Sequence, residues 1–463
     1  MLNRTIDIYS PLTDEVIGKV KAMSKDEVDE AIQKSREALP EWRLKSTAER
    51  MEYLYKASEL LLERKEELVE LLVKEVGKDK KSAYSEVVRT AELIHFTADT
   101  AKSIEGRSIP TETVLGGSKN KFAIIQREPI GVILAISPFN YPVNLAASKI
   151  APALVGGNTV VFKPATQGSL SGIMLAEVFQ AAGLPEGVLN IVTGKGSEIG
   201  DYVITHPGIN FINFTGSTEV GQHIAKEAKM IPLLMELGGK DAAIVLEDAD
   251  LDLAANQIVA GAFSYSGQRC TAIKRVIALE KVADELKEKI TAKVATLKVG
   301  NPLNTEDALE VVPLINQKSA DYVESLIADA KEKGAKILCG GTREGNLLYP
   351  TVLDYVTEDM KVAWEEPFGP VLPIIRVNSE DEAIRIANKS EYGLQSAVFT
   401  TNIHNAFEIA SKLEVGTVQI NNKTERGPDH LPFLGIKNSG IGVQGISYSI
   451  EAMTRIKSTV VNV

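Results

Sequence analysis

Cys270 has the sequence surroundings of a catalytic thiol. A glycine, Gly267, and a cation, Arg269, come shortly before it. A neighbouring positive charge favours the thiolate, which is the form of cysteine that attacks a carbonyl carbon. The same short pattern also fits a buried structural cysteine. We take Cys270 as the candidate nucleophile.

Two further residues could supply a base and an oxyanion donor. Glu236 ends an apolar segment and precedes Gly238 and Gly239. Burial there would raise the pKa of its carboxyl toward neutrality, which suits a general base. Asn140 follows a predicted strand, at the edge where open α/β sheets bind ligands, and its amide can donate to a developing oxyanion. The alternatives are a hinge glutamate and an ordinary turn asparagine.

Gly216 and Ser217 form a candidate phosphate-binding turn. They follow a predicted strand and open a predicted helix, where free backbone N–H groups bind phosphate, and Ser217 adds a hydroxyl donor. The spacing is not the Gly-x-Gly-x-x-Gly pattern of dinucleotide-binding proteins. A plain strand-to-helix connection therefore fits the segment as well.

Strands and helices that alternate along the chain would position these residues. Val- and Ile-rich segments predict strands at 131–137, 159–162, 188–192, 209–214, 242–246, 275–279, 373–376, 396–399 and 416–420. Helical patterns begin after a capping box of Ser24 and Glu27 and also cover 48–76, 169–182, 283–297, 319–333 and 380–388. This alternation predicts an α/β fold with mostly parallel sheets, in two domains that meet near Gly238 and Gly239. Residues 106–127 break the pattern and predict a β-hairpin arm, and the chain ends in a predicted strand.

Bulk composition excludes several classes of function. The 463 residues suggest two or three domains at about 150 residues each. The net charge of −11 argues against binding to nucleic acid or a membrane surface. Two cysteines form no disulfide framework, and the N-terminus has no signal-peptide core, so we expect a cytoplasmic protein.

Together the motifs resemble those of the aldehyde dehydrogenase superfamily. The segments FNYPVNL, FKPATQGS, NFTGST, MELGGK, SGQRC and EEPFGPVLPI have that family's order and spacing, and the resemblance covers nearly the whole chain. It implies two Rossmann-like parallel-sheet domains plus a small β oligomerisation arm. The implied divisions are 1–105 and 128–237 for cofactor binding, 238–445 for catalysis, and 106–127 with 446–463 for the arm.

The resemblance also implies roles for individual residues. Cys270 would attack the aldehyde, the Asn140 side chain and the Cys270 backbone N–H would hold the oxyanion, and Glu236 would activate the water that hydrolyses the thioester. Family members that bind NAD often carry Glu where this chain has the neutral Thr166, and Lys163 supplies a cation, so we expect NADP. The implied cofactor-binding residues are Ser137, Lys163, Thr166, Asp201, Gly216, Ser217, Leu237, Glu366 and Phe368.

One branch of the superfamily matches better than the others. The segments EVVRTAE, YSGQRCTA and INNKTERGPDHLPFLG resemble the NADP-dependent non-phosphorylating glyceraldehyde-3-phosphate dehydrogenases. The implied reaction turns D-glyceraldehyde 3-phosphate into 3-phosphoglycerate, and several guanidinium forks suit a dianionic phosphate. The implied substrate-binding residues are Arg89, Asn140, Tyr141, Arg269, Cys270, Thr271 and Arg426. His430 and Leu431 lie near the expected substrate mouth, with no assigned role.

Three other functions stay open at this point. A semialdehyde dehydrogenase would need only one or two arginines for a carboxylate substrate such as succinate semialdehyde. A scaffold protein on this fold would have no use for Cys270, Glu236 and Asn140 together. A thiol esterase would bind no cofactor. By the same resemblance we expect a homotetramer that binds no nucleic acid, membrane or metal ion.

Overall fold

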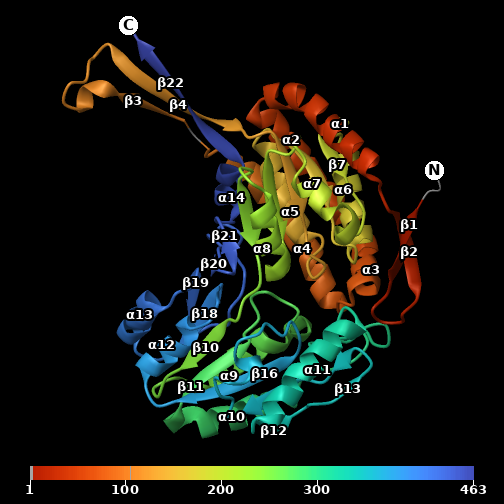
Figure 1. Cartoon of the computed structure of the whole chain (residues 1–463), viewed down its shortest axis with the longest axis vertical. Coiled ribbons are helices and arrows are strands. Elements are labelled where there is room, and N and C mark those ends of the chain that lie inside the picture. Colours follow the sequence, from red (N-terminus) through yellow and green to blue (C-terminus); the bar gives the residue numbers. More distant parts are fainter. Residues whose placement is uncertain (1–3, 105) are drawn as a thin grey trace.

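The computed structural model describes residues 4–104 and 106–463, which form two α/β domains and an arm (Figure 1). The first domain has a six-stranded sheet in the order β21-β9-β8-β5-β6-β7, and all of its pairs are parallel except β21 with β9. Its strands are β5 (Val132–Ile136), β6 (Thr159–Lys163), β7 (Leu189–Ile191), β8 (Phe211–Thr215), β9 (Leu233–Glu236) and β21 (Gly440–Ile441). The hairpin of β1 (Thr5–Tyr9) and β2 (Val16–Lys21) precedes it.

Helices cover both faces of this sheet because its strands are apolar on both sides. Ile133 and Ala135 face one core, formed with α2 to α6, whereas Val132 and Leu134 face a second core with α1, α7 and α8. The helices are α1 (Lys25–Leu44), α2 (Thr47–Glu63), α3 (Lys65–Val76), α4 (Lys80–Ala101), α5 (Asn144–Val155), α6 (Ser169–Ala181), α7 (Asp201–Ile204), α8 (Thr218–Glu227) and α14 (Ile446–Ala452).

The helix predictions hold with one exception. Ser24 and Glu27 form the expected capping box, and Gly183 has the positive φ of 92° expected after α6. The single helix predicted for 48–76 is wrong, because α2 ends at Glu63 and α3 begins at Lys65. Arg64, between them, has φ −93° and ψ 12°, which interrupts the helical backbone.

The second domain has a seven-stranded sheet in the order β12-β15-β16-β11-β10-β18-β19, in which only β12 pairs antiparallel. Its strands are β10 (Ala242–Val245), β11 (Arg275–Leu279), β12 (Lys336–Cys339), β15 (Thr351–Asp354), β16 (Val371–Val377), β18 (Gln395–Phe399) and β19 (Thr417–Ile420). Its helices are α9 (Leu251–Phe263), α10 (Glu280–Val294), α11 (Gln317–Glu332), α12 (Glu380–Asn388) and α13 (Ile403–Lys412). Short two-stranded pairs join β13 (Arg343–Glu344) to β14 (Leu347–Leu348) and β17 (Tyr392–Gly393) to β20 (Ile436–Lys437).

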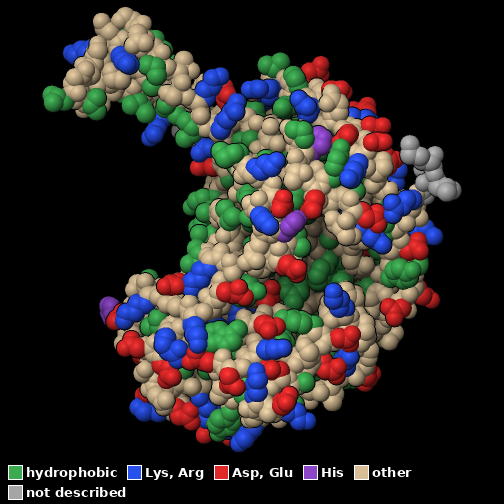
Figure 2. Space-filling model, viewed as in Figure 1, with side chains coloured by type: hydrophobic (Ala, Val, Ile, Leu, Met, Phe, Trp, Pro, Cys, Tyr) green, Lys and Arg blue, Asp and Glu red, His purple; other side chains and the backbone are tan. Residues whose placement is uncertain are grey.

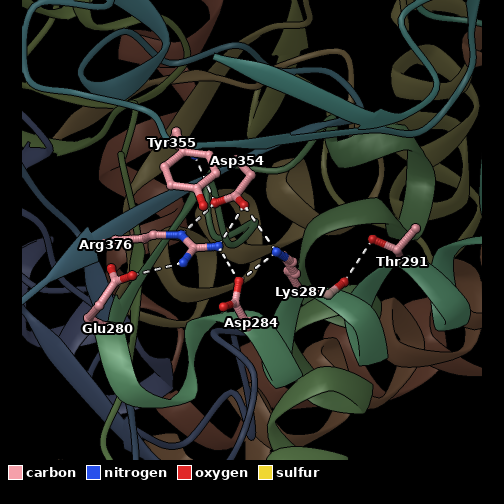
Figure 3. A network of polar contacts seen from close by, with 7 residues as sticks. All are labelled: Glu280, Asp284, Lys287, Thr291, Asp354, Tyr355 and Arg376. Carbon is pink, nitrogen blue, oxygen red and sulfur yellow. Dashed lines mark hydrogen bonds and ion pairs between the residues drawn. The ribbon is translucent and has the colours of Figure 1, made fainter. Parts of the chain in front are cut away.

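A charged network fastens α10 to this second sheet (Figure 3). Arg376 of β16 lies 2.8 Å from Asp354 of β15 and 2.8 Å from Asp284 of α10, and Glu280 accepts from the same guanidinium at 3.0 Å. Lys287 pairs with Asp284 at 2.5 Å. Because Arg376 and Asp354 are nearly buried, the network ties the outer helix to its sheet and belongs to the architecture.

The arm is a three-stranded antiparallel sheet that projects from the first domain (Figure 1). Its strands are β3 (Arg107–Pro110), β4 (Lys121–Pro129) and β22 (Thr454–Asn462). The predicted hairpin and terminal strand therefore pair with each other.

The chain returns to the first domain before the last strand of the arm, which we did not expect. Strand β21 adds to β9 of the first sheet, and α14 packs against α4 and α5. Residues 440–453 therefore belong to the first domain, whereas we had divided them between the catalytic domain and the arm. A two-residue strand carries too little periodicity to be seen in the sequence.

Charged side chains of both signs are scattered over the face of the molecule seen in Figure 2. The arm stands out from the body in the same view. Within residues 4–104 and 106–463, no helix has both the length and the apolar character to cross a bilayer.

Candidate active site

One cavity of about 600 Å³ collects every residue that we predicted for catalysis and substrate binding. The residues come from both domains, since α4, the β5–α5 connection and β9 line one side and the segment after α9 lines the other. They are Arg89, Asn140, Tyr141, Glu236, Arg269, Cys270, Thr271 and Arg426.

A strained turn presents Cys270 to this cavity. Tyr265, Ser266 and Gly267 all have positive φ, at 52°, 56° and 69°. The Ser266 hydroxyl donates to the Val312 carbonyl oxygen and accepts from the Val312 N–H, both at 2.7 Å. Left-handed non-glycine residues persist only where surrounding contacts hold them, and they cluster at functional sites. These contacts fix the backbone from which the thiol projects.

The electrostatic surroundings of the thiol differ from the sequence prediction. Burial raises the pKa of Cys270 to about 11, the Lys274 cation lowers that pKa, and Glu236 and Glu366 raise it. Arg269, which we expected to favour the thiolate, instead donates to the Gly261 carbonyl oxygen at 2.6 Å. The expectation is not met, because α9 binds the Arg269 guanidinium and Arg269 is not among the charges that shift the pKa of Cys270.

Lys274 connects the nucleophile segment to Glu366. Its Nζ donates to the carbonyl oxygen of Cys270 and lies 3.1 Å from Glu366 Oε1. The Lys274 side chain is 2% exposed, so water screens its charge little. Lys274 is therefore the cation that lowers the pKa of Cys270.

Asn140 is held next to the nucleophile segment. Its Nδ2 donates to the carbonyl oxygen of Gln268 at 2.9 Å, and the second N–H of the amide is left for another acceptor. The Glu86 carboxylate accepts from the N–H groups of Val143 and Asn144 at 3.0 and 3.1 Å, which fastens the start of α5. This contact fixes the loop that carries Asn140.

Glu236 lies 1% exposed at the end of β9. Both of its carboxylate oxygens are buried without a hydrogen-bond partner among the described residues. Burial raises its pKa to about 8, while the charges of Arg426 and Lys149 act in the opposite direction. The raised pKa that we predicted from the apolar segment is confirmed.

The three predicted arginines lie at the same cavity, and a carboxylate accompanies two of them. Asp429 Oδ2 lies 3.5 Å from Arg89 Nη2, and Asp429 Oδ1 lies 3.8 Å from Arg426 Nε. Tyr141 lies beside them, and burial raises its pKa, so its hydroxyl remains a donor. The buried Lys78 Nζ sits 3.6 Å from the centre of the Tyr141 ring, a cation–π contact that holds the ring in place.

Of three other residues from this region, Thr271 and His430 make structural contacts and Leu431 is exposed. Thr271 is buried, and its carbonyl oxygen accepts from the Thr424 hydroxyl at 2.9 Å. The His430 ring packs against Phe96, with 5.0 Å between the ring centres. Leu431 is 57% exposed. Neither His430 nor Leu431 lines the cavity around Cys270.

Most predicted cofactor-binding residues follow the strands of the first sheet at its carboxyl edge. Ser137 follows β5, Lys163 ends β6 with Thr166 just beyond, and Ser217 caps α8 after β8. Gly216 and Leu237 follow β8 and β9. Burial alone lowers the pKa of Lys163 to about 8, with no carboxylate to offset it. A buried cation of this kind suits an anionic ligand.

The remaining predicted cofactor residues already have partners within the protein. Glu366 accepts from the Gly239 N–H at 3.1 Å, in addition to its contact with Lys274. Phe368 has φ 48°, and its ring meets Phe139 edge-on at 5.9 Å. Asp201 is 75% exposed and pairs with His223 at 2.7 Å.

Comparison with known proteins agrees with this geometry. The model of the aldehyde dehydrogenase family matches residues 2–459. This chain belongs to the aldehyde dehydrogenase family. The NADP-dependent glyceraldehyde-3-phosphate dehydrogenase of Streptococcus equinus is 58% identical over 458 residues, which is 99% of this chain and 96% of the relative. The enzyme of the same name from Triticum aestivum is 50% identical over 461 residues, which is 99% of this chain and 92% of the relative.

A solved structure is similarly close. The NADP-dependent glyceraldehyde-3-phosphate dehydrogenase from Bacillus halodurans, complexed with NADP, is 56% identical and has a TM-score of 0.98. The match covers 99% of this chain and 96% of that chain. The fold predicted from the motifs, with two parallel-sheet domains and an arm, is thereby confirmed.

Sequence reasoning missed four charged residues of this aldehyde dehydrogenase. They are Lys78, Lys149, Lys274 and Asp429. Lys149 carried a visible signal, because it is the only charged residue in the apolar helix α5. Its Nζ donates to the Thr215 hydroxyl at 2.6 Å, and burial lowers its pKa to about 7. Lys78 pairs with Glu86, eight residues away, whereas Lys274 and Asp429 meet Glu366 and Arg89 far along the chain, which local patterns do not reveal.

Proposed function

We propose that this chain oxidises D-glyceraldehyde 3-phosphate to 3-phosphoglycerate, with NADP as the electron acceptor. The observation that carries this proposal is the single cavity in which three arginines and the Tyr141 hydroxyl accompany Cys270, Asn140 and Glu236. The names of the full-length relatives, at 50% and 58% identity, support the same substrate and cofactor.

The residues at the carboxyl edge of the first sheet fit NADP. Lys163 is a buried cation whose pKa no carboxylate of the described residues raises, and Thr166 is neutral, so neither residue repels a 2′-phosphate. The N-terminus of α8, with the Ser217 hydroxyl, suits the diphosphate. When bound, NADP would supply the hydride acceptor for oxidation of the Cys270 thiohemiacetal to a thioester.

The cavity residues can carry the covalent chemistry. The Cys270 thiolate adds to the aldehyde carbon, and the carbonyl oxygen becomes an oxyanion. The free N–H of the Asn140 amide and the Cys270 backbone N–H are the donors that we assign to this oxyanion. Because a thiolate adds far better than a thiol, the high pKa of Cys270 makes its deprotonation a condition for the reaction.

Glu236 is suited to the hydrolytic step. As a carboxylate it accepts a proton from water, the water oxygen attacks the thioester carbon, and the sulfur leaves as a thiolate. The products are 3-phosphoglycerate, whose new carboxyl group ionises, the Cys270 thiolate, and a protonated Glu236 that must lose its proton before the next turnover. Its two oxygens have no hydrogen-bond partner among the described residues and can accept from that water, and a pKa of about 8 gives useful basicity.

The second candidate is a semialdehyde dehydrogenase for a substrate with a carboxylate. Asp429 accompanies both Arg89 and Arg426, whereas Arg269 has no carboxylate partner in the described ranges. One unpaired guanidinium suits a monoanion. Three guanidinium groups around one carboxylate nevertheless leave two positive charges, which match a phosphate dianion better.

An NADPH-formation assay separates the two candidates. Glyceraldehyde 3-phosphate, unphosphorylated glyceraldehyde and succinate semialdehyde would be compared by kcat/KM. We expect the phosphorylated aldehyde to be preferred at least tenfold over the other two. A higher kcat/KM for the semialdehyde would overturn the phosphate assignment, and no NADPH from any aldehyde would revive the scaffold or esterase alternatives.

We further propose assembly into a homotetramer through the arm. A row of apolar side chains crosses the arm, since Ile109 pairs with Ala123 and Ala123 pairs with Val460. Ile109 and Val460 are 38% and 50% exposed.

Both cysteines are free thiols, which suits a reducing compartment such as the cytoplasm.

A further inference from the structure

Asp429 lies beside two of the arginines that line the cavity, although Asp429 is not itself a lining residue. Its side chain is 12% exposed and approaches Arg89 at 3.5 Å and Arg426 at 3.8 Å. Arg89 Nη2 also donates to the Arg426 carbonyl oxygen at 3.4 Å. The two guanidinium groups and the carboxylate therefore form one cluster at the cavity.

The carboxylate of Asp429 is held loosely. The two distances exceed the roughly 2.7–3.2 Å of a good N–H···O hydrogen bond, so these are ion pairs without close hydrogen bonding. Asp429 Oδ1 is buried and has no hydrogen-bond partner among the described residues. Moving this carboxylate away from the two arginines would therefore break no close hydrogen bond.

We propose that Asp429 is an internal counter-ion that competes with the substrate's phosphate for Arg89 and Arg426. In the free protein it neutralises one of the three positive charges and keeps the two guanidinium groups at the cavity. An incoming phosphate replaces it as their partner. This inference rests on the proposed function, because it concerns the same anion site.

The competition has a definite sign. A phosphate offers about two negative charges and three acceptor oxygens. It therefore binds the fork-shaped guanidinium groups more strongly than a single carboxylate does. Asp429 still repels the bound phosphate, which weakens binding of substrate and product alike. A residue that merely supported the loop would have the opposite effect, since its loss would disorder the arginines and weaken anion binding.

The chain offers a matched control in Glu425. Glu425 lines the cavity itself, and its carboxylate pairs with Lys423 at 2.6 Å. Removing the Glu425 charge takes one negative charge from the cavity wall without freeing Arg89 or Arg426. Comparing the Asp429 and Glu425 variants separates the effect of pairing with the arginines from the effect of the overall charge of the cavity on phosphate binding.

The test is calorimetric binding of inorganic phosphate and of acetate to the full-length protein without cofactor, at about pH 8. We expect Asp429→Asn to bind phosphate about three- to tenfold more tightly than the native protein, since a partly exposed ion pair contributes modestly. Acetate, with one charge, should gain less. Asp429→Glu should stay within about twofold of the native protein, and Glu425→Gln should change by less than Asp429→Asn.

Unchanged or weaker phosphate binding by a folded Asp429→Asn variant would overturn the proposal, and so would an equal gain in Glu425→Gln. If Asp429→Asn fails to fold, Asp429→Ser replaces it with the same expected gain. Because the assay reads binding of inorganic phosphate, it stands apart from turnover. Should the native enzyme prefer succinate semialdehyde, the proposed function fails while this measurement still decides the role of Asp429.

Discussion

At the scale of single residues, the free protein holds its two main catalytic candidates in the forms that are less reactive. Burial raises the pKa of both Cys270 and Glu236, to about 11 and about 8. Lys274 is the first cation that opposes this effect at the thiol. The two side chains are therefore sensitive to pH and to their charged neighbours.

Replacing Lys274 tests this electrostatic account of the thiol. Lys274→Met removes the cation that lowers the pKa of Cys270, so the pKa should rise further and the thiolate fraction at a given pH should fall. The pH dependence of iodoacetamide alkylation of Cys270 measures this, and each unit of upward shift slows alkylation about tenfold at neutral pH. Lys240→Met is the matched control. Lys240 is also a buried lysine, but it is not among the groups that shift the pKa of Cys270. An unshifted profile in Lys274→Met would refute the role of Lys274.

The pKa of Glu236 predicts the pH dependence of hydrolysis. Glu236 acts as a base only when deprotonated, so the rate of thioester hydrolysis should rise as pH increases through about 8. Arg426→Met removes the charge that lowers this pKa most, and should move the midpoint to higher pH. Single-turnover hydrolysis over about pH 6 to 9.5 gives both midpoints. A midpoint near the ordinary glutamate value would contradict the burial argument.

Sequence reasoning worked for residues whose chemistry is set by their own segment. The burial of Glu236 followed from its apolar strand, and Asn140 from its place after β5. The assignment of Arg269 as the partner of the thiol failed, because adjacency along the chain does not fix the direction of a long side chain. Lys274 faces Glu366, and Asp429 faces Arg89, across distances in the sequence that no local pattern reports.

At the scale of elements, the turn after α9 controls where the thiol points. Gly267 has φ 69°, and a Cβ there would lie 2.6 Å from the Gly369 carbonyl oxygen. Any larger residue therefore meets both an unfavourable backbone conformation and backbone atoms that cannot give way. The strands could be predicted from apolar runs, whereas the break at Arg64 could not, because no glycine or proline marks it.

Gly267→Ala should lower both stability and turnover. The backbone conformation alone costs about 1 kcal/mol, and the contact with Gly369 adds to it. Gly345→Ala is the control, because Gly345 has a similar φ of 59° with no atom within 4 Å of its Cβ position. Thermal unfolding and kcat measure the two effects. Equal losses in the two variants would show that the turn does not position the nucleophile.

At the scale of the whole molecule, the arm lies apart from the chemistry. It projects away from both domains in Figure 1, and Ile109 and Val460 of its apolar row are partly exposed. The hairpin was predictable from Pro110 and the paired glycines that interrupt the helical pattern. The return of residues 440–453 to the first domain was not, because it depends on pairing with β9 rather than on a local signal.

A charge on the apolar row should weaken assembly. Val460→Asp places a carboxylate in the row of Ile109, Ala123 and Val460, where burying it against another subunit is costly. Thr459→Asp adds the same charge to the opposite face of β22 and serves as the control. Light scattering after size exclusion gives the mass of each assembly. An undiminished mass for Val460→Asp would argue against this row as an interface.

The most direct test of the central claim is to trap the acyl group on the enzyme. Glu236→Gln should slow hydrolysis, so mixing this variant with glyceraldehyde 3-phosphate and NADP should leave a 3-phosphoglyceroyl group on the peptide that contains Cys270. Peptide mass spectrometry detects that group, and Cys339 in the same digest reports non-specific modification. The account predicts the adduct on Cys270 alone, together with about one NADPH per site. Substantial NADPH formation without an adduct on Cys270, or an equal adduct on Cys339, would contradict it.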